Sequence, residues 1–261
     1  MVITSIKDAF SVAGKNALIT GGTQGLGRAM MEAYAELGAN VGFTGRTLEK
    51  GQKVEQELAE RFPAVKITFY QADHRTQEGC QSAVDAFIAD YGKIDVLINN
   101  AGAGAGADSI DFIDNNFADW HSTIDLDLTG VFMMSTMAAK SMRETGGGSI
   151  INISSMAGMT VLKPQVCIAY STAKAAVIHM TKSLAWEWAK YGIRVNTIAP
   201  GYFKTELEIA GLADEWLEMS PTDRFGEPIE VAAAAVYLGS DASDQITGTP
   251  ILIDGGYCLA N

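Results

Sequence analysis

The sequence predicts a single α/β domain with a doubly wound, about seven-stranded, mostly parallel sheet and helices on both faces. Two observations lead to this prediction. Short apolar runs alternate with longer amphipathic ones along the whole 261-residue chain. The short runs also lack the polar alternation of a strand with one face in water, so both faces of the sheet must be covered. Regular alternation of strands and helices with right-handed crossovers produces a doubly wound sheet.

The strands are predicted from the short apolar runs in chain order. The seven runs are residues 16–20, 40–44, 65–70, 94–98, 149–153, 193–198 and 250–253. Helices are predicted from the turn after the first strand to Leu37, and over residues 48–61, 76–91, 116–143, 171–191 and 229–238, with a helical cap region over 204–220. Neither a linker nor a repeat interrupts the chain, so we expect residues 1–261 to form one domain. A segment at about 202–228 is amphipathic and acts either as a lid over a substrate or as a cover for the core.

The charge balance excludes several classes of partner. The chain has 19 Lys and Arg against 31 Asp and Glu, a formal net charge of -12. Such a surface repels phosphate backbones and anionic lipids, so we expect no nucleic-acid or membrane partner. No stretch approaches the ~18 consecutive apolar residues of a membrane span, and the first residues lack a secretion-signal pattern.

The cysteines and histidines are few and scattered. Cys80, Cys167 and Cys258 lie far apart in the sequence, as do the three histidines. This pattern fits neither a disulfide framework nor a zinc site of familiar spacing. We therefore expect a cytoplasmic protein without a metal. Cys167 either borders a substrate pocket or fills a small apolar space.

A glycine-rich turn follows the first predicted strand. Residues 20–27 read TGGTQGLG and open a helix, which is the context typical of a dinucleotide-binding turn. Gly21 permits a tight turn, Gly25 lets the backbone approach a pyrophosphate, and Gly27 lets helix and strand pack closely. The helix amides then face the phosphates. This pattern predicts a Rossmann-type cofactor site; the alternative is a turn without a ligand.

The end of the second strand indicates which nicotinamide cofactor is preferred. Residues 41–47 read VGFTGRT, with no carboxylate where an NAD site has one. Arg46 stands where an adenosine 2′-phosphate would lie, and its guanidinium is an always-charged, bidentate partner for phosphate. The pattern therefore predicts NADP(H) rather than NAD. The alternative is a solvated arginine at a helix start.

Further motifs follow the later strands in order. Residues 99–102 read NNAG, Ser154 and Ser155 follow the fifth predicted strand, and Pro200 and Gly201 follow the sixth. Tyr170 and Lys174 form a YxxxK pair that shares one helix face. With TGGTQGLG and the DGG at 254–256, the chain resembles the short-chain dehydrogenase/reductase family along nearly its whole length, and within it the sugar- and polyol-converting members.

The resemblance implies an enzyme that moves a hydride between a nicotinamide and a small ketone or secondary alcohol. Tyr170 would exchange the proton, although an unperturbed phenol titrates near ~10. The ammonium of Lys174 would lower that pKa, and the family's lysine also holds the nicotinamide ribose. Ser155 would orient the carbonyl; it is preferred to Ser154 because the family's serine is followed by two residues and a glycine, as in SMAG here. The alternative for Tyr170 and Lys174 is an ordinary pair on a helix surface.

One position departs from the family pattern. Asp127 stands where the family usually has an Asn that helps to hold a water in a proton relay to the lysine, largely through its backbone carbonyl. Asp127 preserves the backbone part of that role, while its charge changes the local electrostatics. Some sugar- and polyol-converting relatives resemble this variant. We count Asp127 among the candidate catalytic residues.

The resemblance also implies further cofactor contacts. They are Thr23, Gln24 and Leu26 in the glycine turn, Asp73 and His74 on the adenine side, Asn100 and Gly102 near the ribose, and Pro200, Gly201, Phe203 and Thr205 near the carboxamide.

Substrate choice is expected to lie in residues 102–110, 156–168 and 202–228. The third segment carries many carboxylates, which disfavours an acidic carrier protein and favours a small neutral ketose, polyol or sugar acid. A 3-oxoacyl-thioester reductase is the alternative. A non-catalytic NADP(H)-binding sensor would lack Tyr170 or Lys174. The helices that carry Asp127 and Tyr170 are rich in Ala, Met and Val. The resemblance implies that they pair between subunits in a homotetramer or homodimer, although their apolar stripes would also suit an intramolecular core.

Overall fold

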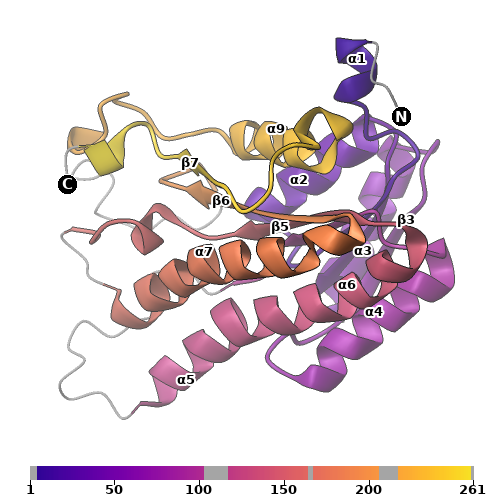
Figure 1. Ribbon diagram of the computed structural model, residues 1–261, viewed down its shortest axis with the longest axis horizontal. Helices are drawn as coiled ribbons and strands as arrows, with labels where there is room; N and C mark the ends of the chain where they lie inside the picture. Colours follow the sequence, from indigo (N-terminus) through magenta and orange to yellow (C-terminus); the bar gives the residue numbers. More distant parts are fainter. Residues whose placement is uncertain (1–4, 103–116, 164–166, 206–216, 260–261) are drawn as a thin grey trace.

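The computed structural model describes residues 5–102, 117–163, 167–205 and 217–259. Within these residues, seven strands form one parallel sheet in the order β3-β2-β1-β4-β5-β6-β7 (Figure 1). The strands are β1 (Asn16–Ile19), β2 (Asn40–Gly45), β3 (Ile67–Gln71), β4 (Val96–Asn99), β5 (Gly148–Ile153), β6 (Ile193–Pro200) and β7 (Pro250–Ile253). The predicted fold class is confirmed.

The apolar runs form the middle of the sheet because both of its faces are covered. All residues of β1 and β4 are buried, as an apolar run without polar alternation predicts. Two strands begin two residues later than predicted: β3 begins at Ile67 rather than Val65, and β4 begins at Val96 rather than Ile94. Asp95 lies just before β4, and its carboxylate accepts a hydrogen bond from the Asn16 amide of β1 at 2.9 Å.

Helices cover the two faces as separate layers (Figure 1). One layer and the sheet share an apolar core with α2 (Gly25–Glu36), α3 (Leu48–Arg61) and α9 (Pro228–Gly239). The opposite core contains side chains of α4 (Gln77–Tyr91), α6 (Val131–Thr145) and α7 (Ile168–Trp188). The other α-helices of the described part of the chain are α1 (Ile6–Ala9), which the sequence did not indicate, and α5 (Ala118–Ile124).

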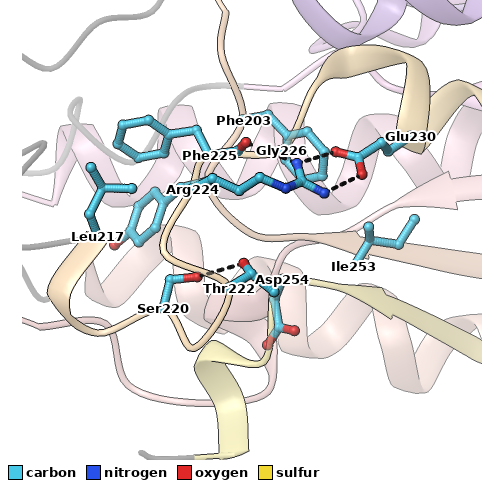
Figure 2. Close-up of a pocket in the computed structure, with 12 residues that line it drawn as sticks. Phe203, Leu217, Ser220, Thr222, Arg224, Phe225, Gly226, Glu230, Ile253 and Asp254 are labelled. Atoms are coloured by element: carbon cyan, nitrogen blue, oxygen red, sulfur yellow. Dashed lines mark hydrogen bonds and ion pairs between the residues drawn. The ribbon is translucent and has the colours of Figure 1, made fainter.

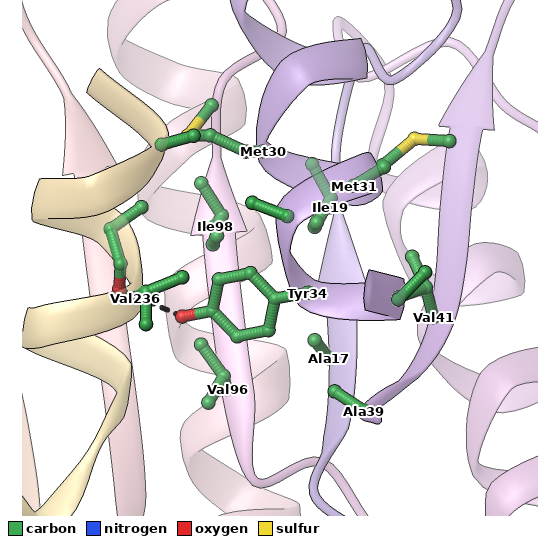
Figure 3. Packing of buried hydrophobic residues seen from close by; sticks show 14 of the residues in the cluster. Ala17, Ile19, Met30, Met31, Tyr34, Ala39, Val41, Val96, Ile98 and Val236 are labelled. Atoms are coloured by element: carbon green, nitrogen blue, oxygen red, sulfur yellow. Dashed lines mark hydrogen bonds between the residues drawn. The ribbon is translucent and has the colours of Figure 1, made fainter. Parts of the chain in front are cut away.

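A buried hydroxyl group links two helices within the first core. Tyr34 of α2 is fully buried among Met30, Val96 and Val236, and its hydroxyl donates to the Ala235 carbonyl of α9 at 2.8 Å (Figure 3). Gly239 ends α9 beside it, and a Cβ there would lie 2.0 Å from the Tyr34 hydroxyl oxygen. Tyr34 therefore joins α2 to α9 at close range.

The last crossover departs from the right-handed prediction. The chain moves in one direction across the sheet from β4 through β5 and β6 to β7. The helices before β5 and β6 pack in the second core, whereas α9 packs with α2 in the first. Because α9 lies on the opposite face, the β6-α9-β7 crossover has the opposite hand to its neighbours, against the strong general preference.

A ladder of polar side chains crosses the sheet inside the second core. Asn99 of β4 donates to Asn152 of β5 at 2.8 Å, and Asn152 donates to the Thr181 hydroxyl at 2.9 Å. Thr197 of β6 donates to the same hydroxyl at 2.9 Å. Asn99 also donates to Ser135 of α6 at 2.8 Å. These buried bonds fix the relative positions of three neighbouring strands at their carboxyl ends.

The long helix predicted over residues 116–143 is interrupted. Helix α5 begins at Ala118, residues Asp125–Gly130 form a wide π-helical turn, and α6 continues to Thr145. The predicted 171–191 helix begins earlier, at Ile168, and its last residues form a 3₁₀ turn, Ala189–Tyr191. Most of the predicted cap region, residues 206–216, lies outside the described residues.

Candidate active site

The glycine turn at the carboxyl end of β1 has the geometry that the sequence indicated. Gly21 has φ +68°, and a Cβ there would lie 2.9 Å from the Ala101 Cα. A Cβ on Gly27 would lie 2.3 Å from the Gly21 carbonyl oxygen. Side chains at both positions would therefore clash with backbone, so the steric reasons for these two glycines are confirmed.

The turn leaves room and hydrogen-bond donors for a phosphate. Gly25 has φ +56°, and among the described residues only Thr205 lies within 4 Å of a Cβ built on it. Gln24, the residue before α2, makes no side-chain hydrogen bond to the helix amides. The first amides of a 12-residue helix thus lie beside an open glycine, which fits a pyrophosphate. Thr205, which the sequence placed near the carboxamide, lies beside this turn.

The ends of β1 and β4 are joined beside this turn. The Thr20 hydroxyl accepts hydrogen bonds from the Asn100 and Ala101 amides, each at 2.9 Å. The Asn100 side chain donates to the Thr20 and Gly21 carbonyls at 3.0 and 3.1 Å. The side-chain amide of Asn100 therefore holds the glycine turn in place.

Of the residues that the sequence placed on the adenine side or near the 2′-phosphate, Arg46 and Asp73 are accessible to solvent and His74 is not. Arg46 follows β2 and is exposed. The Arg75 guanidinium, 2.6 Å from the Asp73 carboxylate, lowers the pKa of Asp73 to about 2. His74 is buried, its Nε2 lies 2.6 Å from the Thr44 hydroxyl, and burial lowers its pKa to about 4. The His74 ring is thus a neutral, interior group.

Four predicted catalytic residues meet at the carboxyl ends of β4 and β5. Tyr170 and Lys174 come from α7, Ser155 follows β5, and Asp127 lies in the π-helical turn. The Lys174 Nζ lies 2.8 Å from Asp127 Oδ1 and donates to the Ile153 carbonyl at 3.2 Å. It also lies 5.4 Å from the centre of the Tyr170 ring. Residues distant in sequence therefore form one cluster.

The choice of Ser155 over Ser154 agrees with their contacts. Ser154 donates its hydroxyl to the Lys174 backbone carbonyl at 2.7 Å, so it anchors the helix. Ser155 hydrogen-bonds the hydroxyl of Tyr170 and accepts from the Ala157 amide at 3.1 Å. Ser155 is thus the serine in contact with the tyrosine hydroxyl.

The charges of the cluster oppose one another. Burial raises the pKa of Tyr170, the Lys174 ammonium and the Ser155 hydrogen bond act to lower it, and Asp127 raises it. Burial acts to lower the pKa of Lys174, but the attraction of Asp127 and Tyr170 is larger in sum and raises it. Lys174 is therefore a charged ammonium at neutral pH, and a carboxylate already neutralises it.

Gly102, the last residue of NNAG, lies against this ion pair. A Cβ on Gly102 would lie 2.5 Å from Asp127 Oδ1 and 3.2 Å from the Lys174 Nζ. Any larger residue would push the carboxylate away. The remainder of the predicted 102–110 loop, residues 103–110, lies outside the described residues.

A separate hollow lies between the ends of β6 and β7 (Figure 2). Phe203 and Asp254 line it, together with Ser220, Thr222 and Arg224 from the predicted lid segment. Arg224 forms a two-bonded ion pair with Glu230 at 2.7 and 2.9 Å. Neither Tyr170 nor Lys174 is among its lining residues, so this hollow is distinct from the cluster.

Pro200 is buried at the end of β6, and a Cβ on the adjacent Gly201 would lie 2.7 Å from the Asp254 Cα.

Two further features concern the described residues alone. None of their helices has the length and apolar character needed to cross a membrane. Nor do their His, Cys, Asp and Glu side chains form a group of three or more that could hold a metal ion.

Comparisons with known proteins place the chain in a family. A family model described as "Enoyl-(Acyl carrier protein) reductase" matches residues 21–258. A "Probable NADP-dependent mannitol dehydrogenase" from Yarrowia lipolytica is 37% identical over 98% of this chain and 92% of its own length. An "NAD-dependent glycerol dehydrogenase" from Listeria innocua is 37% identical over 96% of each chain. The crystal structure of an NADPH-dependent 3-quinuclidinone reductase from Rhodotorula rubra superposes with a TM-score of 0.92, at 38% identity over 99% of this chain and 97% of that one.

The fold, the glycine turn and these relatives define an oxidoreductase that acts on alcohol groups with a nicotinamide dinucleotide. The chain belongs to the short-chain dehydrogenase/reductase family.

Proposed function

We propose that this protein is an NADP(H)-dependent oxidoreductase that interconverts a small polyol with its ketose, or a related sugar acid with its keto form. The cluster of Ser155, Tyr170 and Lys174 beside the glycine turn supports this proposal most directly. It places a proton-exchanging hydroxyl, a hydrogen-bond donor and a cation at the edge of the sheet where a dinucleotide binds.

Each residue of the cluster has a separate role. The hydroxyl of Ser155 orients the substrate oxygen, and Tyr170 exchanges the proton at that oxygen. Lys174 supplies a positive charge beside Tyr170 and a donor for ribose hydroxyls. The nicotinamide, when bound, donates or accepts the hydride. Gly21, Gly25 and Gly27 leave space for the pyrophosphate.

Arg46 supports the preference for NADP(H). It is exposed at the end of β2, and the residues before it include no carboxylate to bind a ribose 2′-hydroxyl. The mannitol dehydrogenase relative is named NADP-dependent, whereas the glycerol dehydrogenase relative is named NAD-dependent. We infer that Arg46 binds the 2′-phosphate in this chain.

The names of the relatives and the charge of the chain favour a small neutral substrate. The two curated relatives are named for polyols, and a net charge of -12 disfavours an acidic carrier protein. A 3-oxoacyl-thioester reductase is the second candidate, because the description of the matching family model names a reductase that acts on acyl carrier protein.

We further infer a homodimer or homotetramer in the cytoplasm. Phe132 of α6 and Trp186 of α7 are 47% and 89% exposed, and an interface between copies of the chain would cover these apolar side chains. The three cysteines lie far apart in the sequence, which favours a reducing compartment.

A substrate panel tests the function. Purified protein is assayed by nicotinamide absorbance with ketoses, small ketones and a 3-oxoacyl thioester plus NADPH or NADH, and with polyols plus the oxidised cofactors. We expect turnover of a ketose–polyol pair and a higher kcat/KM with NADPH. A higher kcat/KM for the thioester than for every ketose would favour the second candidate, and equal or better efficiency with NADH would contradict the role of Arg46.

A further inference from the structure

The buried ion pair of Asp127 and Lys174 is the most unusual feature of the cluster. Their side chains are 0% and 4% exposed, and the charged atoms lie 2.8 Å apart. Removing two charges from water is costly unless each finds a partner of opposite charge. Asp127 is therefore the counter-ion that allows Lys174 to stay charged inside the protein.

Lys174 has two candidate anions and only one charge. Its other polar contact among the described residues, the Ile153 carbonyl at 3.2 Å, is neutral. The second group that could balance the ammonium is the phenolate of Tyr170, whose ring centre lies 5.4 Å from the same nitrogen. When Asp127 provides the negative charge, a phenolate gains less from Lys174, and the neutral phenol is favoured.

The surroundings of Tyr170 contain few other charges. The charged or titratable groups that act on it are Lys174, Asp127 and Cys167, with Ser155 as its hydrogen-bond partner. Asp119 and His121 of the neighbouring α5, and Asp125 of the π-helical turn, are exposed to solvent. The 3₁₀ turn Met156–Gly158, which also packs on α7, carries no titratable side chain. Asp127 is thus the one carboxylate that acts on Tyr170 among the described residues.

We propose that Asp127 is the resident counter-ion of Lys174 and that it keeps Tyr170 in its protonated form, so that the site is set to deliver a proton to a carbonyl at neutral pH. This proposal rests on the function proposed above, and it makes Asp127 a positioning residue that acts through Lys174. In reduction, the O–H bond of Tyr170 breaks and its proton joins the substrate oxygen, while the carbonyl carbon receives the hydride. In oxidation, the phenolate must take that proton back. The direction of the pKa of Tyr170, raised by burial and by Asp127, agrees with this assignment.

The test measures the titration of Tyr170 in the protein without cofactor. The chain has 8 tyrosines, so the ultraviolet titration of each protein is compared with that of the same protein carrying Tyr170→Phe, and the difference isolates Tyr170. Asp127→Asn removes the charge and keeps the shape. We expect the Tyr170 inflection to move about 1–2 pH units lower in Asp127→Asn.

Two variants serve as controls. Asp125→Asn makes the same chemical change two residues away on the exposed side of the same turn, and its Tyr170 inflection should match the wild type. Asp127→Glu retains the charge and should keep the inflection within about half of the Asn shift. Thermal unfolding verifies that each variant is folded. If Asp127→Asn fails to fold while Asp127→Glu folds, the ion pair of Asp127 and Lys174 is required for folding. The titration is then compared between the wild type and Asp127→Ser.

The pH profiles extend the test to turnover. In Asp127→Asn, the rising limb of alcohol oxidation and the falling limb of ketone reduction should both move to lower pH. An unchanged or higher Tyr170 inflection in the Asn and Ser variants overturns the proposal. The titration needs no substrate, so an inactive substrate panel with a shifted inflection would contradict the proposed function and leave the role of Asp127 intact.

Discussion

Two tyrosines on opposite faces of the sheet show how surroundings assign a role to the same side chain. Tyr34 lies in an apolar core, where its hydroxyl has the Ala235 carbonyl as partner. Tyr170 is half-buried beside Ser155, Lys174 and Asp127. Burial raises the pKa of both. Only Tyr170 has an ammonium near its ring and a second hydroxyl group at its oxygen, so only Tyr170 is equipped to exchange a proton.

The difference lies in the elements that meet around each ring. Tyr34 is held where two helices pack side by side on one face of the sheet (Figure 3). Tyr170 stands where a strand end, a helix and a π-helical turn converge at the carboxyl edge. Helix packing supplies apolar contacts, whereas the edge of a parallel sheet supplies loop ends with polar groups. We therefore expect substitutions around Tyr34 to change the free energy of unfolding, and substitutions around Tyr170 to change the rate of the reaction.

The largest expected effect is on turnover at Tyr170. Tyr170→Phe removes the proton-exchanging hydroxyl, and we expect kcat to fall by about 10²–10⁴-fold. The melting temperature and the dissociation constant of the cofactor, measured by fluorescence titration, should stay close to the wild type. Tyr34→Phe is the matched control, because it makes the same chemical change and should leave kcat unaltered. Substantial residual turnover in Tyr170→Phe would contradict the assigned role.

An intermediate effect is expected on stability at Gly239. Gly239→Ala places a methyl group where it would lie 2.0 Å from the Tyr34 hydroxyl. We expect the free energy of unfolding in urea to fall by roughly 1–3 kcal/mol. The kcat of the folded enzyme should not change. A loss below about 0.5 kcal/mol would show that α9 moves aside easily.

The smallest effect is expected at the Tyr34 hydroxyl. Tyr34→Phe loses one buried hydrogen bond, which is worth about 1 kcal/mol of unfolding free energy. Combined with Gly239→Ala, it removes the atom that the new methyl group meets, so the double variant should be more stable than the sum of the single changes by about 1 kcal/mol. Simple additivity would mean that the two residues do not share a contact.

Much of the fold could be predicted because its signals are local. The seven apolar runs and the turns after them are short patterns that physical rules interpret directly. Each run overlaps one of the seven strands of the described residues. The steric roles of Gly21 and Gly27 could also be predicted, because each depends on the adjacent turn.

Features that depend on distant parts of the chain could not be predicted. Asp127 and Lys174 were both candidates, yet their direct contact requires the π-helical turn to face α7. Such a turn differs from an α-helix in its hydrogen bonding and has no residue signature of its own. The same holds for the ladder from Asn99 to Thr197, since polar residues within apolar runs do not name their partners. The opposite hand of the last crossover depends on the face that α9 selects, which no local pattern encodes.

The π-helical turn at Asp125–Gly130 has a consequence for how this chain can change over evolution. Such a turn holds one more residue than an α-helical turn of the same rise. Loss of a single residue between the start of α5 and Asp127 would let α-helix run on, and each residue of α-helix rotates the chain by about 100°. The carboxylate would then leave α7, and Lys174 would be left without its counter-ion. The number of residues in this turn is therefore constrained more strongly than the identity of most of them, because that number sets where the Asp127 carboxylate lies.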